Sequence, residues 1–137
     1  AGVGGLAVAC ATYARKIWGS DPKIIVVEPD AAPAIHASIL AGSAQSTNGP
    51  VSNMGRLDCK EPSLIALKGL ARDANVFALI SEEEGQAGSD IAENLGLTST
   101  PSGAAGIAAL IAAKRHRDTL GLSEKSRILC ILSEEAS

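Results

Sequence analysis

Residues 1–18 read AGVGGLAVACATYARKIW, in which a glycine cluster runs directly into a helical pattern. After the glycines, apolar or small residues recur at the spacing of one helix face: Leu6, Ala9, Cys10, Tyr13 and Ile17. Glycines that lead into a helix let backbone N–H groups approach a phosphate closely, and the positive end of the helix dipole adds to the attraction. The stretch therefore predicts a phosphate-binding loop followed by a helix.

The rest of the chain alternates predicted strands and helices. Continuous β-branched runs of strand length lie at residues 23–30, 75–81 and 127–133. Helical patterns lie between them, at about 31–40, 62–74, 82–96 and 101–117. Strands that alternate with helices imply parallel pairing through crossover helices. We therefore expect an α/β fold, with three α/β/α layers, a mainly parallel sheet and a single domain over residues 1–137.

Capping signals explain most charged residues at the predicted helix ends. Asp30 is suited to cap the helix after the first strand, and Pro62 suits a first helical turn. Ser81 and Glu84 form an S-x-x-E capping box, which accounts for the acidic run 82–84 without a metal or substrate role. The cations at 114–117 likewise suit the negative end of a helix dipole.

Composition argues against several classes of function. The formal net charge is -3 and no long basic run occurs, so a nucleic-acid surface is not expected. Cys10, Cys59 and Cys130 are far apart, and the chain has 2 histidines, so we expect no metal site and reduced thiols in a cytoplasmic protein. No apolar stretch reaches the roughly 18 residues of a membrane-spanning helix, so no membrane association is expected.

The glycine loop alone leaves several functions open. Gly2, Gly4 and Ala7 satisfy the G-x-G-x-x-A pattern of dinucleotide-binding domains, and Glu28 ends the next strand, where a ribose-binding acid would lie. The interval from Gly2 to Glu28 exceeds the roughly 20 residues usual for that acid. A dinucleotide-binding domain, a non-catalytic module for a phosphate ligand and a glycine turn that only packs a helix on a strand are the alternatives.

Other stretches give the chain a resemblance to a known family. GVGGLA at 2–7 resembles the phosphate loop of fold-type II pyridoxal-phosphate enzymes, which include threonine and serine dehydratases, serine racemase and the β subunit of tryptophan synthase. Three further stretches match in the same order: VVEP at 26–29, TPSGAAGIAAL at 100–110 and ILCILSEEAS at 128–137. The segment VSNMGRLDCKEPS at 51–63 is more particularly similar to diaminopropionate ammonia-lyase and its relatives.

The resemblance implies a pyridoxal 5'-phosphate cofactor and assigns residues to it. The phosphate would be held by the backbone amides of five residues: Gly2, Val3, Gly4, Gly5 and Leu6. Gly55 would lie in a loop near the ring, and the hydroxyl of Ser133 would face the pyridine nitrogen. A neutral hydrogen bond there leaves the ring a weaker electron sink than a carboxylate would, which favours elimination over transamination.

The chain also departs from the family pattern. Thr100 stands where dehydratases usually have Glu, and Glu134 follows Ser133 where relatives commonly carry a glycine next to or after the hydroxyl residue. The family's Schiff-base lysine precedes the glycine loop, and none of the six lysines here lies in a segment that resembles its motif: Lys16, Lys23, Lys60, Lys68, Lys114 and Lys125. We therefore expect the C-terminal part of a large PLP-binding domain without its lysine-bearing half, and no catalytic residue in this chain.

The implied activity is that of a lyase of amino-acid metabolism. It would eliminate ammonia from 2,3-diaminopropionate or a related amino acid and yield a 2-oxo acid. The full-length enzyme would be a homodimer that binds a small amino-acid substrate. Other fold-type II activities, a serine or threonine dehydratase or a racemase, are the alternatives within enzymes. We expect this chain alone to be inactive and, because its apolar helices and sheet edge lack cover, to self-associate or to fold poorly.

Overall fold

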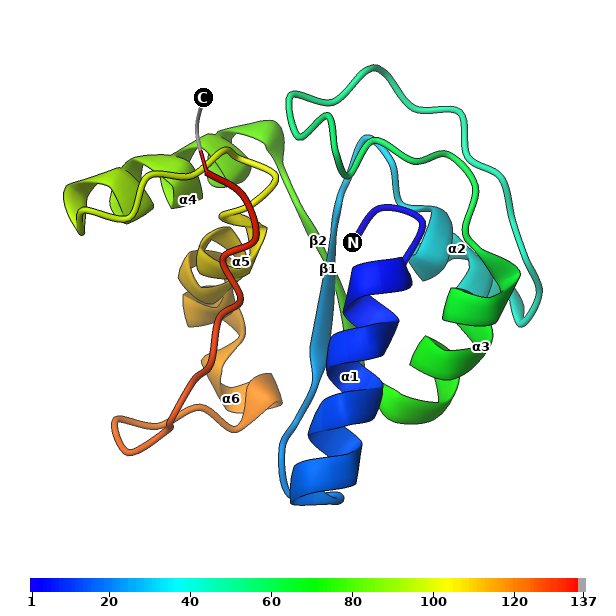
Figure 1. Cartoon of the computed structure of the whole chain (residues 1–137), viewed down its shortest axis with the longest axis horizontal. Coiled ribbons are helices and arrows are strands. Elements are labelled where there is room, and N and C mark those ends of the chain that lie inside the picture. The colour runs from blue at the N-terminus through cyan, green and yellow to red at the C-terminus, as the bar shows by residue number, and fades with distance from the viewer. Residues whose placement is uncertain (136–137) are drawn as a thin grey trace.

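The computed structural model describes residues 1–135 and places two parallel strands between two layers of helices (Figure 1). Strands β1 (Ile25–Pro29) and β2 (Val76–Ile80) pair in parallel along their whole length. One layer holds helices α1 (Gly5–Trp18), α2 (Ala34–Ala41) and α3 (Leu64–Asp73), and the other holds α4 (Glu82–Asn94) and α5 (Ala105–Ala113). The α/β class with a parallel sheet is confirmed.

Each face of the sheet has its own hydrophobic core. On one face, Val26 of β1 packs with buried residues of α1, α2 and α3: Ala11, Ile35 and Leu70. On the other face, Ile80 of β2 packs with buried residues of the 50–60 segment and α5: Met54, Ala105 and Ala108. Because helices cover both faces, β2 is a continuous apolar run and β1 is apolar apart from Glu28, as is usual for strands of parallel sheets.

The start of α4 follows its predicted signal, whereas the start of α3 differs from its prediction. The Ser81 hydroxyl accepts from the Glu84 amide at 3.2 Å, and the Glu84 carboxylate accepts from the Ser81 amide at 3.0 Å, which confirms the capping box. Ser63 caps α3 by accepting from the amide of Ala66. Pro62 therefore lies just before the helix and not in its first turn as predicted, because the serine takes the capping position.

The prediction that Asp30 caps α2 is wrong. The capping carboxylate belongs to Glu28, whose Oε1 accepts from the Ile35 amide at 2.9 Å and whose Oε2 accepts from the His36 amide at 2.7 Å. Strand β1 directs Glu28 into the buried space at the start of α2, whereas Asp30 is exposed in the turn after the strand. The helix consequently begins at Ala34, later than its sequence pattern predicts.

The alanine-rich run divides into shorter helices. After α5 come a 3₁₀ turn, η1 (Lys114–His116), and a short helix, α6 (Arg117–Leu120). The guanidinium of Arg115 pairs with the Glu84 carboxylate in the first turn of α4, so this cation has a partner as well as a favourable place at a helix end. Within residues 1–135, no helix has the length and apolar character needed to cross a membrane.

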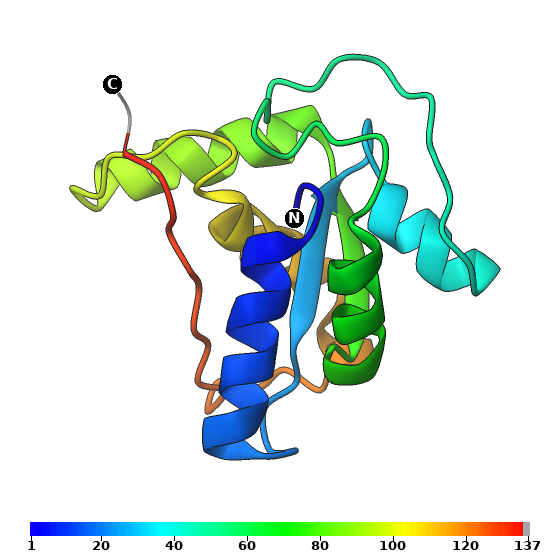
Figure 2. The same cartoon turned by 45° about the vertical axis from the view of Figure 1, so that its right-hand side comes forward.

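The predicted third strand, residues 127–133, does not form. The segment follows an extended path past α5 to the level of α4 in Figures 1 and 2, and the Cys130 thiol donates to the Gly106 carbonyl at 3.5 Å. A strand is defined by hydrogen bonds to a neighbouring strand, and among the described residues only β1 and β2 pair with each other. The apolar pattern is therefore that of a strand, but the segment has no strand beside it.

Candidate cofactor site

The glycine loop, residues 2–5, lies beside β1 in Figures 1 and 2, where the amino group of Ala1 donates to the Val27 carbonyl. Gly4 has φ 99° and ψ -2°, in the left-handed region, and Gly5 begins the right-handed helix α1. Successive amides in such a conformation form a concave nest that binds anions. A Cβ on Gly4 would lie 2.9 Å from Ala66 Cβ and 3.0 Å from Ile35 Cδ1, so both conformation and space require glycine here.

The amides of the glycine loop are free to bind a ligand. Within the described chain, the N–H groups of residues 2–6 donate to no acceptor. Gly5 has nothing within 4 Å of the place where a Cβ would stand, and the neighbouring Val3 and Leu6 are 49% and 60% exposed. Unpaired amides at an accessible helix N-terminus favour a phosphate or another anion.

A second loop, residues 50–60, packs directly against the first, and we call it the Gly55 loop. A Cβ on Gly2 would lie 2.8 Å from the Arg56 carbonyl oxygen and 3.0 Å from the Cys59 sulfur. Gly2 therefore permits a close approach between the two loops. Gly55 itself is exposed, with open space on its Cβ side, which leaves its backbone accessible to a bound molecule.

Ser133 lies in an open hollow beside the Gly55 loop. The hollow is lined by Ser133 and four other residues: Arg56, Thr100, Glu134 and Glu135. The Arg56 amide donates to the Ser102 hydroxyl at 3.2 Å, so one residue of the Gly55 loop contacts both the glycine loop and the hollow. The structure thus brings Gly2, Gly55 and Ser133, which are far apart in sequence, into one continuous region.

Thr100 has a structural role. Its hydroxyl accepts from the Gly103 amide at 3.0 Å and donates to the Glu134 carboxylate. Glu134 also lies 3.8 Å from the Arg56 guanidinium, whose side chain is 82% exposed. These contacts fix the turn before α5, which starts at Ala105, so Ser102 and Gly103 belong to that turn.

Glu28 takes part in the core of the fold and not in ligand binding. The residue is 1% exposed, and both carboxylate oxygens accept amides of α2. Burial raises the pKa of this carboxyl, and the hydrogen bonds from Ile35 and His36 oppose that rise. A carboxylate buried in this way is not available to a ribose, so the assignment of Glu28 to a dinucleotide is wrong.

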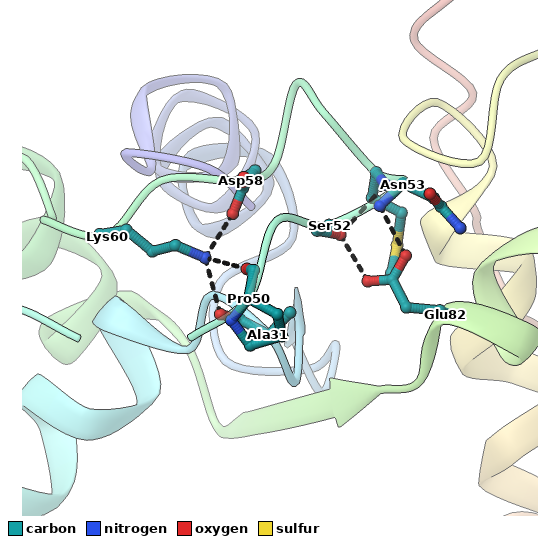
Figure 3. A network of polar contacts seen from close by, with 8 residues as sticks. Ala31, Pro50, Ser52, Asn53, Asp58, Lys60 and Glu82 are labelled. Atoms are coloured by element: carbon teal, nitrogen blue, oxygen red, sulfur yellow. Dashed lines mark hydrogen bonds and ion pairs between the residues drawn. The ribbon is translucent and has the colours of Figure 1, made fainter. Parts of the chain in front are cut away.

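Sequence reasoning missed the contacts that hold the Gly55 loop (Figure 3). The Glu82 carboxylate accepts from the Ser52 hydroxyl and from the Asn53 amide, both at 2.6 Å. The Lys60 ammonium donates to the carbonyls of Ala31 at 2.8 Å and Pro50 at 2.7 Å and pairs with Asp58. No spacing rule relates residue 52 to residue 82, so the sequence carried no signal for this network.

Comparison with protein families identifies the chain. The family described as "Pyridoxal-phosphate dependent enzyme" matches residues 1–134. The chain belongs to this family. Its cofactor is pyridoxal 5'-phosphate, which confirms the cofactor implied by the resemblance. Comparison with curated proteins gives no significant match.

Solved structures of the pyridoxal-phosphate family share the fold. Diaminopropionate ammonia lyase from Escherichia coli, in complex with an aminoacrylate-PLP azomethine intermediate, is 25% identical with a TM-score of 0.85 over 98% of this chain and 37% of its own. An L-serine ammonia-lyase from Rhizomucor miehei is 21% identical, with a TM-score of 0.85 over 98% of this chain and 43% of its own. Threonine deaminase isoform 2 from Solanum lycopersicum is 21% identical, with a TM-score of 0.87 over 100% of this chain and 37% of its own. The chain thus spans less than half of each of these proteins.

The residues present fit the phosphate end of this cofactor. The nest at Gly4 and the free amides of residues 2–6 supply donors without a competing internal acceptor, and Gly5 leaves room above them. A phosphate group is a negatively charged hydrogen-bond acceptor, so backbone donors at a helix N-terminus stabilise it. The glycine loop has the geometry for that role.

Proposed function

We propose that the protein to which this chain belongs is a pyridoxal-phosphate-dependent ammonia-lyase that acts on 2,3-diaminopropionate or a related amino acid. The observation that carries the proposal is the 25% identity to a diaminopropionate ammonia lyase over 98% of the chain. The wider family includes deaminases and racemases of the same fold, which are the alternatives that the experiment below separates.

Each site residue has a proposed role that follows from its own chemistry. The amides of Gly2, Val3, Gly4, Gly5 and Leu6 bind the phosphate, and the N-terminus of α1 adds a favourable field. Gly55 would lie near the ring, where the lack of a side chain leaves room. The Ser133 hydroxyl would make a neutral hydrogen bond to the ring nitrogen. When bound, the cofactor supplies the electron sink that stabilises negative charge at the α-carbon of the substrate.

The proposed reaction removes the α-proton and the β-amino group of the substrate. Loss of ammonia from 2,3-diaminopropionate gives 2-aminoacrylate, and addition of water to its imine tautomer then releases pyruvate and a second ammonia. We assign the proton-removing base and the cofactor-binding lysine to a part of the protein outside residues 1–137. Lys60, the lysine of the Gly55 loop, is engaged by two carbonyls and Asp58, which supports that assignment.

Product stoichiometry tests the proposal. The protein that contains this chain, saturated with pyridoxal 5'-phosphate, is incubated separately with 2,3-diaminopropionate, serine and threonine, and 2-oxo acid and ammonia are quantified. We expect two ammonia per pyruvate from 2,3-diaminopropionate. Turnover of serine or threonine alone, with one ammonia per 2-oxo acid, would show a dehydratase. Interconversion of serine enantiomers without 2-oxo acid would show a racemase, and either result would overturn the proposal.

Substitution of Ser133 tests its proposed contact with the ring. Ser133→Ala removes one neutral hydrogen bond, which corresponds to a roughly 2- to 10-fold loss of cofactor affinity. The dissociation constant of pyridoxal 5'-phosphate is measured by fluorescence titration. Ser20→Ala is the matched control, because Ser20 is exposed in the turn after α1, at the opposite end of that helix from the glycine loop. Equal affinities in Ser133→Ala and the wild type would remove Ser133 from the site.

A further inference from the structure

The position of the Gly55 loop depends on the first residue of α4. Glu82 directs both carboxylate oxygens at the loop and accepts from Ser52 Oγ and from the Asn53 amide, each at 2.6 Å. The Ser52 side chain is buried, and its hydroxyl also accepts from the Met54 amide at 3.0 Å. Figure 3 shows the carboxylate reaching across from α4 to the turn that begins the loop. Hydrogen bonds to a charged acceptor are among the stronger ones in proteins.

Packing reinforces this attachment at the next residue of the loop. Met54 is fully buried in the core formed with Ile80 and α5. A Cβ on Gly85 would lie 2.9 Å from Met54 Sδ, so the methionine occupies the space beside the first turn of α4. Gly55 follows immediately in the chain. The hydrogen bonds of Ser52 and Asn53 and the contact of Met54 with Gly85 therefore attach the chain just before Gly55 to the start of α4.

The far side of the loop contacts the glycine loop. The Arg56 carbonyl and the Cys59 sulfur approach Gly2 so closely that a Cβ there would overlap both. The Lys60 ammonium fixes the end of the loop to the carbonyls of Ala31 and Pro50. A displacement of the Gly55 loop at Ser52 would consequently change the contacts of Arg56 and Cys59 with Gly2.

The three acids at the start of α4 differ in what they contact. Glu84 completes the capping box and pairs with Arg115, and Glu83 is exposed. Glu82 alone of the three reaches the Gly55 loop. Helix capping does not explain the contact of Glu82 with the Gly55 loop, because Ser81 and Glu84 complete the capping box without Glu82.

We propose that Glu82 is a positioning residue for the cofactor: its two hydrogen bonds to Ser52 and Asn53 hold Gly55 and Arg56 against the glycine loop in the arrangement that binds pyridoxal 5'-phosphate. Glu82 itself touches no group of the cofactor. The inference rests on one part of the proposed function, the position of the cofactor between the glycine loop and the Gly55 loop. It does not depend on the substrate. It adds a residue of α4 to those on which cofactor affinity depends.

Affinity for pyridoxal 5'-phosphate is measured in the protein that contains this chain, for the wild type and three variants. Glu82→Ala removes both hydrogen bonds and should weaken binding at least about tenfold, the effect of one charge-assisted hydrogen bond. Glu82→Gln retains the shape and one good acceptor, so its affinity should lie between the two. Glu83→Ala removes the same charge from the same helix turn and should bind within about twofold of the wild type.

Hydrogen exchange and a double-mutant cycle separate positioning from general stability. Exchange of the amides at residues 52–56 should become faster in Glu82→Ala while that of α1 and α3 stays unchanged. Ser52→Ala should weaken cofactor binding too, and the double variant should lose less than the product of the two single losses. If Glu82→Ala does not fold, Glu82→Gln decides the question, because it is nearly isosteric.

The possible results distinguish this inference from the proposed function. A wild type that does not bind pyridoxal 5'-phosphate would contradict the cofactor site itself and both conclusions with it. A wild type that binds, with both Glu82 variants equal to it, would overturn the positioning role and leave the proposed function standing. A loss in Glu83→Ala as large as that in Glu82→Ala would show a charge effect and would also overturn the role.

Discussion

Replacement of Gly4 by alanine should destabilise the fold much more than the same replacement one residue later. Gly4 is buried with φ 99°, and an added Cβ would meet Ala66 Cβ at 2.9 Å and Ile35 Cδ1 at 3.0 Å. Gly5 begins α1, is exposed, and has nothing within 4 Å of an added Cβ. The two positions therefore give a matched pair within one loop.

The magnitude follows from two separate effects. A left-handed backbone costs an alanine about 1–2 kcal/mol relative to glycine. Overpacking against Ala66 and Ile35 adds about 1–3 kcal/mol, because both contacts lie in a close-packed core. Gly4→Ala should thus lower the free energy of unfolding by about 2–5 kcal/mol. Gly5→Ala should raise it by up to about 1 kcal/mol, since alanine is the better residue in a helix.

Urea-induced unfolding of the apo-protein, followed by circular dichroism, measures both changes. A common slope for the wild type and the variants is required for the midpoints to report stability alone. Cofactor affinity, titrated in parallel, should fall in Gly4→Ala because the nest of amides is distorted. If Gly4→Ala and Gly5→Ala unfolded at the same urea concentration, the reasoning about this loop would be refuted.

Two further predictions concern contacts that hold the helices. Ser81→Ala should lower the free energy of unfolding by about 1 kcal/mol, because it removes the side-chain cap of α4. Thermal unfolding checks this, and an unchanged midpoint would mean that the capping box contributes nothing. Hydrogen bonds from Arg72 and Thr12 hold the pKa of Asp73 well below its usual range, so Asp73 stabilises the fold above its unfolded pKa of about 3.9 and loses this effect as the pH falls below it. Asp73→Asn should therefore be less stable than the wild type at pH 6, and the difference in urea midpoint should shrink toward pH 3. A difference that stays constant with pH would contradict this cause.

The elements that sequence patterns predicted well are those whose signals are local. The helix after the glycines, the two buried strands and the Ser81 capping box each depend on residues within a few positions of one another. Such features depend on neighbouring residues only. The spacing of apolar residues favours a helix or a strand, and the Ser81 side chain caps an amide three residues later, without contacts from the rest of the fold. The glycine loop belongs to this group as well.

The features that the sequence did not predict depend on contacts between distant residues. Glu28 and not Asp30 caps α2, because the direction of β1 decides which carboxylate reaches the helix. Residues 127–133 have the apolar content of a strand, but strand formation needs a partner that the described chain does not place beside them. The attachment of Ser52 to Glu82 joins segments with no sequence relation.

The parallel pairing of β1 with β2 has a consequence for how fast the chain can fold. Between Pro29 and Val76 lie α2, the Gly55 loop and α3, and all of them must be bridged before the first ladder hydrogen bond forms. Val26 belongs to one core and Ile80 to the other, so neither core is complete until that long closure has occurred. Because closure entropy is lost before non-local contacts compensate for it, pairing of β1 with β2 should be slower than the formation of local helical contacts. During synthesis, β1 and β2 can pair with each other only after the chain has extended past Ile80.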